Sequence, residues 1–78
     1  MPRYFFNVYD DVIADDEEGR ELPNVAAARL EALRGARSLI ADQVTHGYLV
    51  LSHWIDVLDE HGEKVLTVTF RDALDIKE

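Results

Sequence analysis

One long amphipathic segment constrains the fold of this chain more than any other feature. Asn24 is a suitable N-cap residue, and from Val25 apolar residues recur at steps of three and four positions until Gly47 interrupts the pattern. The apolar stripe consists of Ala26, Leu30, Leu33, Ile40 and Val44. This spacing predicts a helix from Val25 to Thr45 or His46, about 31 Å long at ~1.5 Å per residue, whose stripe must pack against another element.

Two pairs of short apolar segments, one on each side of this helix, predict β-hairpins. Residues 4–9 are aromatic and β-branched and alternate as a strand does, and residues 12–14 can return beside them after a turn. Residues 52–59 and 64–70 form the second pair, separated by a turn that contains Gly62. The sequence therefore predicts an α+β fold of order β-β-α-β-β, with an antiparallel or mixed four-stranded sheet and one long helix packed on one face.

Alternation along the strands divides their side chains between a face toward the helix and an open face. The predicted core consists of Tyr4, Phe6, Val8, Leu30, Leu33, Ile40, Val44, Ile55, Val57, Leu66, Val68 and Phe70. The candidate interaction surface on the open face consists of Phe5, Trp54, Leu58 and Val65. Trp54 has two interpretations, because it either contacts a partner or lies beneath the C-terminal tail through Leu74 and Ile76.

Two residues of the predicted helix depart from the amphipathic pattern. Gly35 costs a helix about 1 kcal/mol relative to Ala, and by projection it faces away from the sheet. Arg37 falls near the middle of the apolar stripe. Its guanidinium either selects an anionic ligand or reaches the edge of the core, where it is solvated or pairs with an Asp.

The length of 78 residues leaves room for one domain, spanning residues 1–78, with one core. Apolar residues make up 47% of the sequence and charged residues 31%, which is typical of a folded globular domain. A core of this size contributes only ~3–5 kcal/mol net, and there is no cysteine that could add a disulfide. We therefore expect a small interaction module, stabilised as a homodimer through the open sheet face or an edge strand.

The formal net charge of −8 excludes some partners and favours others. Nucleic acid and anionic membranes would be repelled, whereas a basic protein would be attracted. No apolar run approaches the ~20 residues needed to cross a bilayer, and Asp10 and Asp11 come too early for an apolar signal peptide. We expect a cytoplasmic protein that binds neither nucleic acid nor membrane.

Acidic residues are densest between Asp10 and Glu21, where Arg20 supplies the single positive charge. This stretch has three interpretations: a solvated loop, a Ca²⁺ or Mg²⁺ site, or a docking surface for a basic partner. The spacing of its carboxylates does not match an EF-hand loop.

No motif in the sequence predicts an enzyme. Ser38 and Ser52 lack the glycine-flanked pattern of a nucleophile elbow. His46, His53 and His61 fall at a helix end, in a strand and in a turn, without the close ligand pair of a zinc site. We therefore predict no catalytic residue, no metal site and no cofactor.

Four segments resemble a known group of proteins along nearly the whole chain. They are residues 1–8 (MPRYFFNV), the acidic 16–23 ending in Glu-Leu-Pro, the Ala-rich helix, and residues 59–66. These segments resemble a family of short, uncharacterised bacterial proteins common in rhizobia and other alphaproteobacteria, in which His often stands where this chain has Asn7. The resemblance implies a bacterial cytoplasmic protein and carries over no functional residue.

A weaker resemblance is to antitoxins of the HicB type. In those proteins a strand pair with acidic-Gly turns precedes a helix with a Glu-Ala-Leu motif, here Glu31-Ala32-Leu33. This chain lacks the further strand and the Pro-Gly-Cys-like turn before that helix, and it has no appended DNA-binding module. The resemblance implies an acidic antitoxin-like or regulatory partner of a basic protein as the alternative to a homodimer, with a small-ligand or cation binder as a second alternative.

Overall fold

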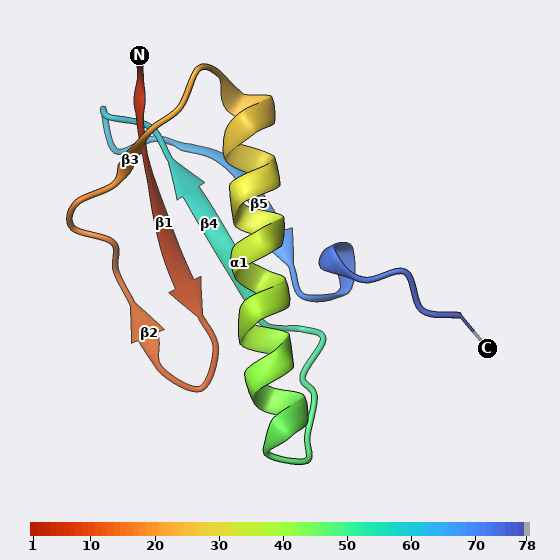
Figure 1. The fold of residues 1–78 in the computed structure, drawn as a ribbon. Coiled ribbons are helices and arrows are strands. Elements are labelled where there is room, and N and C mark those ends of the chain that lie inside the picture. Colours follow the sequence, from red (N-terminus) through yellow and green to blue (C-terminus); the bar gives the residue numbers. More distant parts are fainter. Residues whose placement is uncertain (78) are drawn as a thin grey trace.

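The helix α1 lies across one face of an antiparallel sheet in the computed structural model, which describes residues 1–77 (Figure 1). The elements in chain order are β1 (Arg3–Tyr9), β2 (Ile13–Ala14), β3 (Arg20–Glu21), α1 (Val25–Thr45), β4 (Trp54–Leu58), β5 (Lys64–Thr69) and the 3₁₀-helix η1 (Arg71–Ala73). The α+β class, the two layers and the single long helix agree with the sequence-based expectation. No helix among residues 1–77 is both long and apolar enough to traverse a lipid bilayer.

Local capping signals determine both ends of α1. The Asn24 side chain accepts a hydrogen bond from the backbone N–H of Ala27 at 2.9 Å, which satisfies one of the free N–H groups of the first turn. At the other end His46 is the C-cap and Gly47 adopts a φ of 87°, a left-handed conformation that favours glycine. The predicted helix from Val25 to Thr45 is therefore confirmed.

The sheet contains one more strand than the sequence predicts. Its order is β2-β1-β4-β5, and β3 pairs with the same strand β1 through Arg3 with Glu21 and Tyr4 with Arg20. All strand pairs are antiparallel. The acidic stretch after β2 thus runs back along β1 and pairs with it again, over two residues that are too few to produce a recognisable alternation.

Asp16 bridges the gap between β2 and β3 along the edge of β1. Its carboxylate accepts the backbone N–H of Phe6 at 3.1 Å, and its own N–H donates to the side chain of Asn7 at 3.0 Å. Gly19 follows with a φ of 68°, and a Cβ there would lie 2.8 Å from the carbonyl oxygen of Tyr4. The acidic loop is therefore bound closely to β1, and Asp16 performs the pairing that a strand residue would otherwise provide.

The core differs from the predicted one mainly on the helix. The fully buried apolar residues are Tyr4, Ala28, Ala32, Leu33, Ala36, Ile40, Ile55, Val57, Val68, Phe70 and Ala73. Leu30 and Val44, predicted to be buried, are 61% and 57% exposed. The helix turns its small alanines toward the sheet, which lets the two layers approach closely, and the larger apolar side chains that dominate the hydropathy pattern point outward.

Gly35 is a second correction on the helix. It was expected to face away from the sheet, but a Cβ at this position would lie 3.7 Å from the Cδ1 atom of Ile55 on β4. Gly35 therefore faces the sheet, beside the buried alanines. Arg37 is exposed, and its Nε atom donates a hydrogen bond to the carbonyl oxygen of Ala73 at 2.9 Å, so it joins the helix to η1.

The C-terminal segment packs on the helix side of the sheet. Ala73 is buried, Leu74 packs against the core, and Ile76 is 59% exposed. The Trp54 ring instead stacks on Tyr9. The interpretation in which Leu74 and Ile76 cover Trp54 is therefore wrong.

Candidate functional site

The strand register arranges the open sheet face in three transverse rows. At one end Tyr9 of β1 pairs with Ile13 of β2 and with Trp54 of β4, which places these three side chains in one row across three strands. The Tyr9 and Trp54 rings are stacked, with centroids 5.0 Å apart and planes 11° apart. Ile13 is 67% exposed and Trp54 is 38% exposed. We call Ile13, Tyr9 and Trp54 the aromatic row.

The middle row of the open face is polar. Asn7 pairs with Asp56, and Asp56 pairs with Thr67 across β4 and β5. The Thr67 hydroxyl donates to the Asp56 carboxylate at 2.7 Å, so this charge already has one hydrogen-bond partner within the chain. The open face therefore alternates apolar and polar rows.

The third row carries Phe5 and Leu58, which pair across β1 and β4 and are both half-buried. The register of β4 with β5 shifts here, and Leu58 pairs with Lys64. Val65 lies at this irregularity and packs, partly buried, against the core. Of the four candidate residues, Phe5, Trp54 and Leu58 therefore lie on the open face, whereas Val65 is displaced from it by the β-bulge.

Sequence reasoning missed Tyr9 and Ile13 as members of this surface. Both fall at strand ends, where alternation alone does not say which residues lie opposite one another. The pairing of Tyr9 with both Ile13 and Trp54 supplies that information. The sequence did contain a signal for the first of these pairs. In a hairpin the residue before the turn commonly pairs with the residue after it, and here these residues are Tyr9 and Ile13.

Neither edge of the sheet offers a long free strand. At the β5 edge the backbone N–H of Thr69, the last residue of the strand, donates to Asp72 at 2.9 Å. The β-bulge at Val65 interrupts the strand near its first residue. At the opposite edge β2 spans only Ile13–Ala14 and is flanked by acidic residues. Both edges are therefore short or obstructed.

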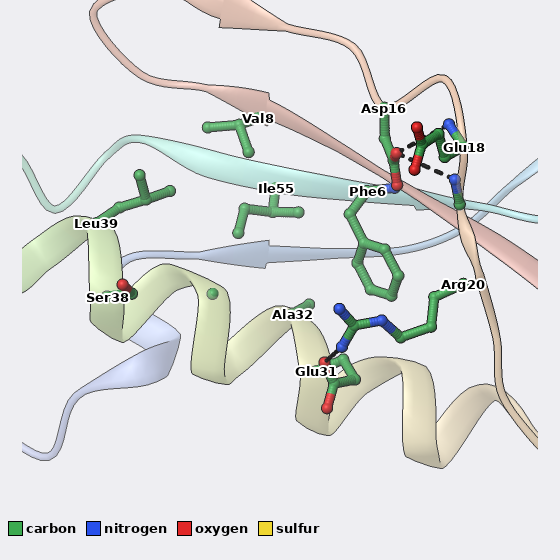
Figure 2. A pocket seen from close by; sticks show the side chains of 12 residues that line it. Phe6, Val8, Asp16, Glu18, Arg20, Glu31, Ala32, Ser38, Leu39 and Ile55 are labelled. Carbon is green, nitrogen blue, oxygen red and sulfur yellow. Dashed lines mark hydrogen bonds and ion pairs between the residues drawn. The ribbon is translucent and has the colours of Figure 1, made fainter.

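A groove opens between α1 and the β1 side of the sheet (Figure 2). The helix packs over β4, β5 and η1, so the helix-facing side of β1 is less covered, and Phe6 and Val8 are only half-buried. The groove has a volume of about 490 Å³. Its apolar lining includes Phe6, Val8, Leu39 and Ile55, and its helix side is formed by small residues, Ala32, Gly35 and Ser38.

One end of this groove carries charged side chains. Arg20 of β3 reaches across to Glu31 of α1 and forms an ion pair with it beside the Phe6 ring, as Figure 2 shows. Asp16 and Glu18 line the same end. The charged groups that line the groove are thus three carboxylates and one guanidinium.

The acidic loop uses several of its carboxylates internally. Besides Phe6, Asp16 accepts the N–H of Gly19 at 3.1 Å, and Asp10 accepts the N–H of Val12 at 3.0 Å. Asp11 accepts the Tyr48 hydroxyl at 2.8 Å, and this hydrogen bond raises the pKa of Tyr48 above its ordinary value of 10.0. Within residues 1–77 no three His, Cys, Asp or Glu side chains are grouped as a metal site would need.

The histidines lie in three separate places, and His53, expected within a strand, lies just before β4. His46 caps the end of α1, and the backbone N–H of His61 donates to Asp59 in the β4–β5 turn. His53 is contacted by Gln43, which is only 3% exposed. The Gln43 Oε1 atom accepts the N–H of Val50 at 3.0 Å, so its Nε2 donates to Nδ1 of His53 at 3.1 Å, and the proton of the neutral imidazole is on Nε2, 3.9 Å from Asp11.

Comparison with known proteins identifies a family but no characterised relative. No curated protein and no solved structure is significantly similar to this chain. A model of a family of unknown function matches residues 3–71, which confirms the resemblance to an uncharacterised family. The chain belongs to the family described as domain of unknown function DUF6894.

Proposed function

We propose that this protein is a small interaction module that forms a homodimer through its open sheet face, centred on the aromatic row. The observation that carries the proposal is the exposure of Ile13 and Trp54 beside the stacked Tyr9 on a face that α1 does not cover. Large aromatic side chains contribute most to association because they bury much area at little entropic cost. Two copies in face-to-face contact would form a helix-sheet-sheet-helix stack.

The condition of the sheet edges favours the face over an edge as the contact. Strand addition needs a run of free N–H and C=O groups. The Thr69–Asp72 hydrogen bond and the bulge at Val65 shorten that run on β5, and β2 has only two residues. Of the two routes to a homodimer, the open face is therefore the better supported.

Electrostatics favours the same end of the open face. Two copies with a net charge of −8 repel one another, so they must meet where local charge is low. The aromatic row contains no ionisable group that is charged near neutral pH, although Asp10 and Asp11 lie beside it in the β1–β2 turn. The Phe5–Leu58 row borders a hollow lined by four carboxylates, those of Asp15, Asp16, Asp59 and Glu60. The smaller number of neighbouring carboxylates favours association centred on the aromatic row.

Light scattering on a sizing column tests this proposal. The wild-type chain of 8.9 kDa should elute with about twice that mass at concentrations near 100 µM, typical for a modest interface. Trp54→Ala should return it to the monomer mass, whereas Leu30→Ala, which removes an exposed apolar side chain from the helix surface, should not. A monomeric wild type, or a dimer unaffected by Trp54→Ala and by Ile13→Ala, would overturn the proposal.

A basic protein partner is the second candidate function. The observation that favours it is the hollow lined by the apolar side chains of Phe5 and Leu58 together with four carboxylates. Salt distinguishes the two candidates, because screening weakens binding to a basic partner and strengthens the pairing of two acidic copies. A complex from cell extract that is lost in high salt would support the second candidate.

We further propose a cytoplasmic location and a non-catalytic role, because the sequence contains no cysteine and no motif of a nucleophile or a general acid–base pair. A cation in the acidic loop receives less support. Asp10, Asp11 and Asp16 already accept hydrogen bonds within the chain, and a cation would have to displace them.

A further inference from the structure

A buried amide and an imidazole meet where the last turn of α1 lies beside the start of β4. Gln43 is 3% exposed, and the His53 side chain is 16% exposed. The Gln43 Nε2 atom lies 3.1 Å from Nδ1 of His53, and its Oε1 atom accepts the N–H of Val50 at 3.0 Å. One side chain of α1 therefore holds both the segment that follows the helix and the ring that precedes β4.

The Gln43 amide can satisfy both neighbours only while His53 is neutral. A side-chain amide has one oxygen, which accepts, and one NH₂ group, which donates. Because Val50 presents an N–H group to the oxygen, the NH₂ group faces His53, and Nδ1 must act as an acceptor. A protonated imidazole carries a proton on both ring nitrogens, so Nδ1 would then face the NH₂ group donor to donor. Protonation of the ring and the Val50 hydrogen bond therefore exclude one another.

His53 nevertheless faces an acidic corner of the molecule. Its Nε2 atom lies 3.9 Å from Asp11 in the β1–β2 turn, and the Tyr48 hydroxyl donates to the same carboxylate at 2.8 Å. From the β5 side the ring meets only the apolar edge-to-face ring of Phe70 among its aromatic contacts, with centroids 5.5 Å apart. The nearest charge, that of Asp11, stabilises a protonated ring, and Gln43 opposes it. The other titratable groups at this corner are Asp10, Asp42 and His46.

We propose that protonation of His53 turns the Gln43 amide over and releases Val50, so that mild acid detaches the segment between α1 and β4 from the end of the helix. With the amide reversed, its oxygen accepts the Nδ1 proton, the Nε2 proton points toward Asp11, and the N–H of Val50 loses its acceptor. Histidine is the side chain whose charge ordinarily changes in this pH range. The proposal is independent of the homodimer, because Gln43 and His53 meet on the helix side of the sheet.

NMR titration of the ¹⁵N-labelled full chain from about pH 8 to about pH 5 tests the proposal. The signals of the Val50 amide and of the Gln43 side-chain amide should move with the same midpoint as the His53 ring. Solvent exchange of the Val50 N–H, corrected for the direct effect of pH, should accelerate about tenfold or more across that midpoint. A ring that stays neutral throughout, or a Val50 amide that does not respond at the midpoint of the ring, would overturn the proposal.

Three substitutions separate His53 from the other titratable groups. His53→Asn keeps an acceptor for Gln43 but has no imidazole to protonate, so Val50 should no longer respond to pH. Gln43→Glu offers an acceptor to both neighbours, so His53 should take up its proton at about tenfold lower proton concentration while Val50 keeps its hydrogen bond. His46→Gln, at the exposed end of α1, is the control and should leave the Val50 response unchanged.

The variants also show how the proposal can fail. A Val50 response that persists in His53→Asn, or that is lost in His46→Gln, would assign the effect to another group and contradict the proposal. If His53→Asn does not fold, Gln43→Glu decides the outcome, because a Val50 amide that still loses its hydrogen bond there would show that the reversal of the amide is not the cause. None of these results bears on the homodimer.

Discussion

Thr69 and Asp72 cap one another where the last strand meets the 3₁₀-helix. The backbone N–H of Thr69 donates to the Asp72 carboxylate at 2.9 Å, and the N–H of Asp72 donates to the Thr69 hydroxyl at 3.1 Å. This reciprocal pair has the hydrogen-bond pattern of a capping box, one residue before Phe70, the N-cap of η1. It starts η1, which carries the buried Ala73, and it occupies an N–H group that would otherwise be free on the edge of β5.

The cap makes the stability of the protein depend on acid pH. The hydrogen bonds from Thr69 lower the pKa of Asp72 below its ordinary value of 3.8. A carboxylate with a lowered pKa in the folded state stabilises the fold above its ordinary pKa, and this contribution is lost as the pH falls through the folded pKa. We expect Asp72→Asn to lower the free energy of unfolding at pH 7 by about 0.5–1 kcal/mol, as for a lost helix cap.

Urea unfolding at pH 7 and at pH 2 measures this effect. The difference between wild type and Asp72→Asn should be present at pH 7 and smaller at pH 2, because the contribution of the Asp72 carboxylate is lost as the pH falls through its lowered pKa. Asp75→Asn is the matched control, because Asp75 is exposed and, within residues 1–77, its carboxylate forms an ion pair only with the exposed Lys77, at 3.7 Å. An equal loss at both pH values would contradict the charge-based explanation.

The hydrogen bond from Tyr48 to Asp11 joins the β1–β2 turn to the segment after α1. Because this bond holds the phenol neutral, the pKa of Tyr48 is raised above 10.0, and its small contribution to stability is present below pH 10 and lost as the pH rises through the folded pKa. We expect Asp11→Asn to lower the Tyr48 pKa toward its ordinary value. Asp10→Asn should lower it less, since Asp10 acts only through its charge. NMR titration of the Tyr48 ring signals distinguishes the two variants, and equal shifts would refute the assignment.

Gln43 is the one buried polar side chain of the helix among the described residues. Both ends of its amide are used, by Val50 and by His53. Gln43→Leu should cost about 1–3 kcal/mol, because it leaves the N–H of Val50 without its acceptor in a partly buried site. Asp42→Leu, on the exposed side of the same turn, is the control and should cost little. Thermal unfolding of the three proteins compares these effects, and similar stability of all three would show that the Gln43 network contributes nothing.

Gly35→Ala should stabilise the protein, although it changes a residue that faces the sheet. The new Cβ meets Ile55 at an ordinary contact distance, and alanine is favoured over glycine in a helix by about 1 kcal/mol. Gly19→Ala provides the contrast. Its Cβ would lie 2.8 Å from the carbonyl oxygen of Tyr4, at a φ of 68°, so it should destabilise. Urea unfolding midpoints measure both variants, and a destabilised Gly35→Ala would mean that the groove wall cannot accept even one methyl group.

The parts of the fold that local signals encode could be predicted from the sequence. Asn24 and Gly47 mark the ends of α1 through capping, and alternation placed Phe5 and Trp54 on the open face. The parts that depend on distant pairing could not. β3 consists of two residues held beside β1, and Val65 leaves the open face because of a bulge that only the pairing of β4 with β5 reveals.

The helix face was mispredicted for a different physical reason. Hydropathy gives most weight to large side chains such as Leu30 and Val44, but close packing of a helix on a sheet favours small ones. The buried stripe therefore runs through Ala28, Ala32 and Ala36. Small residues on the helix, among them Ala32 and Gly35, also leave the space that forms the groove. An alanine-rich helix carries little information about which of its faces is buried.

An isotope-filtered NOE experiment on a mixture of labelled and unlabelled chains tests the homodimer most directly, since it detects only contacts between different copies. We expect intermolecular cross-peaks from the Trp54 ring to the Ile13 methyl groups or the Tyr9 ring of the other copy. The absence of intermolecular cross-peaks to these side chains at concentrations near 1 mM, far above the Kd of an ordinary homodimer, would contradict association through the open sheet face.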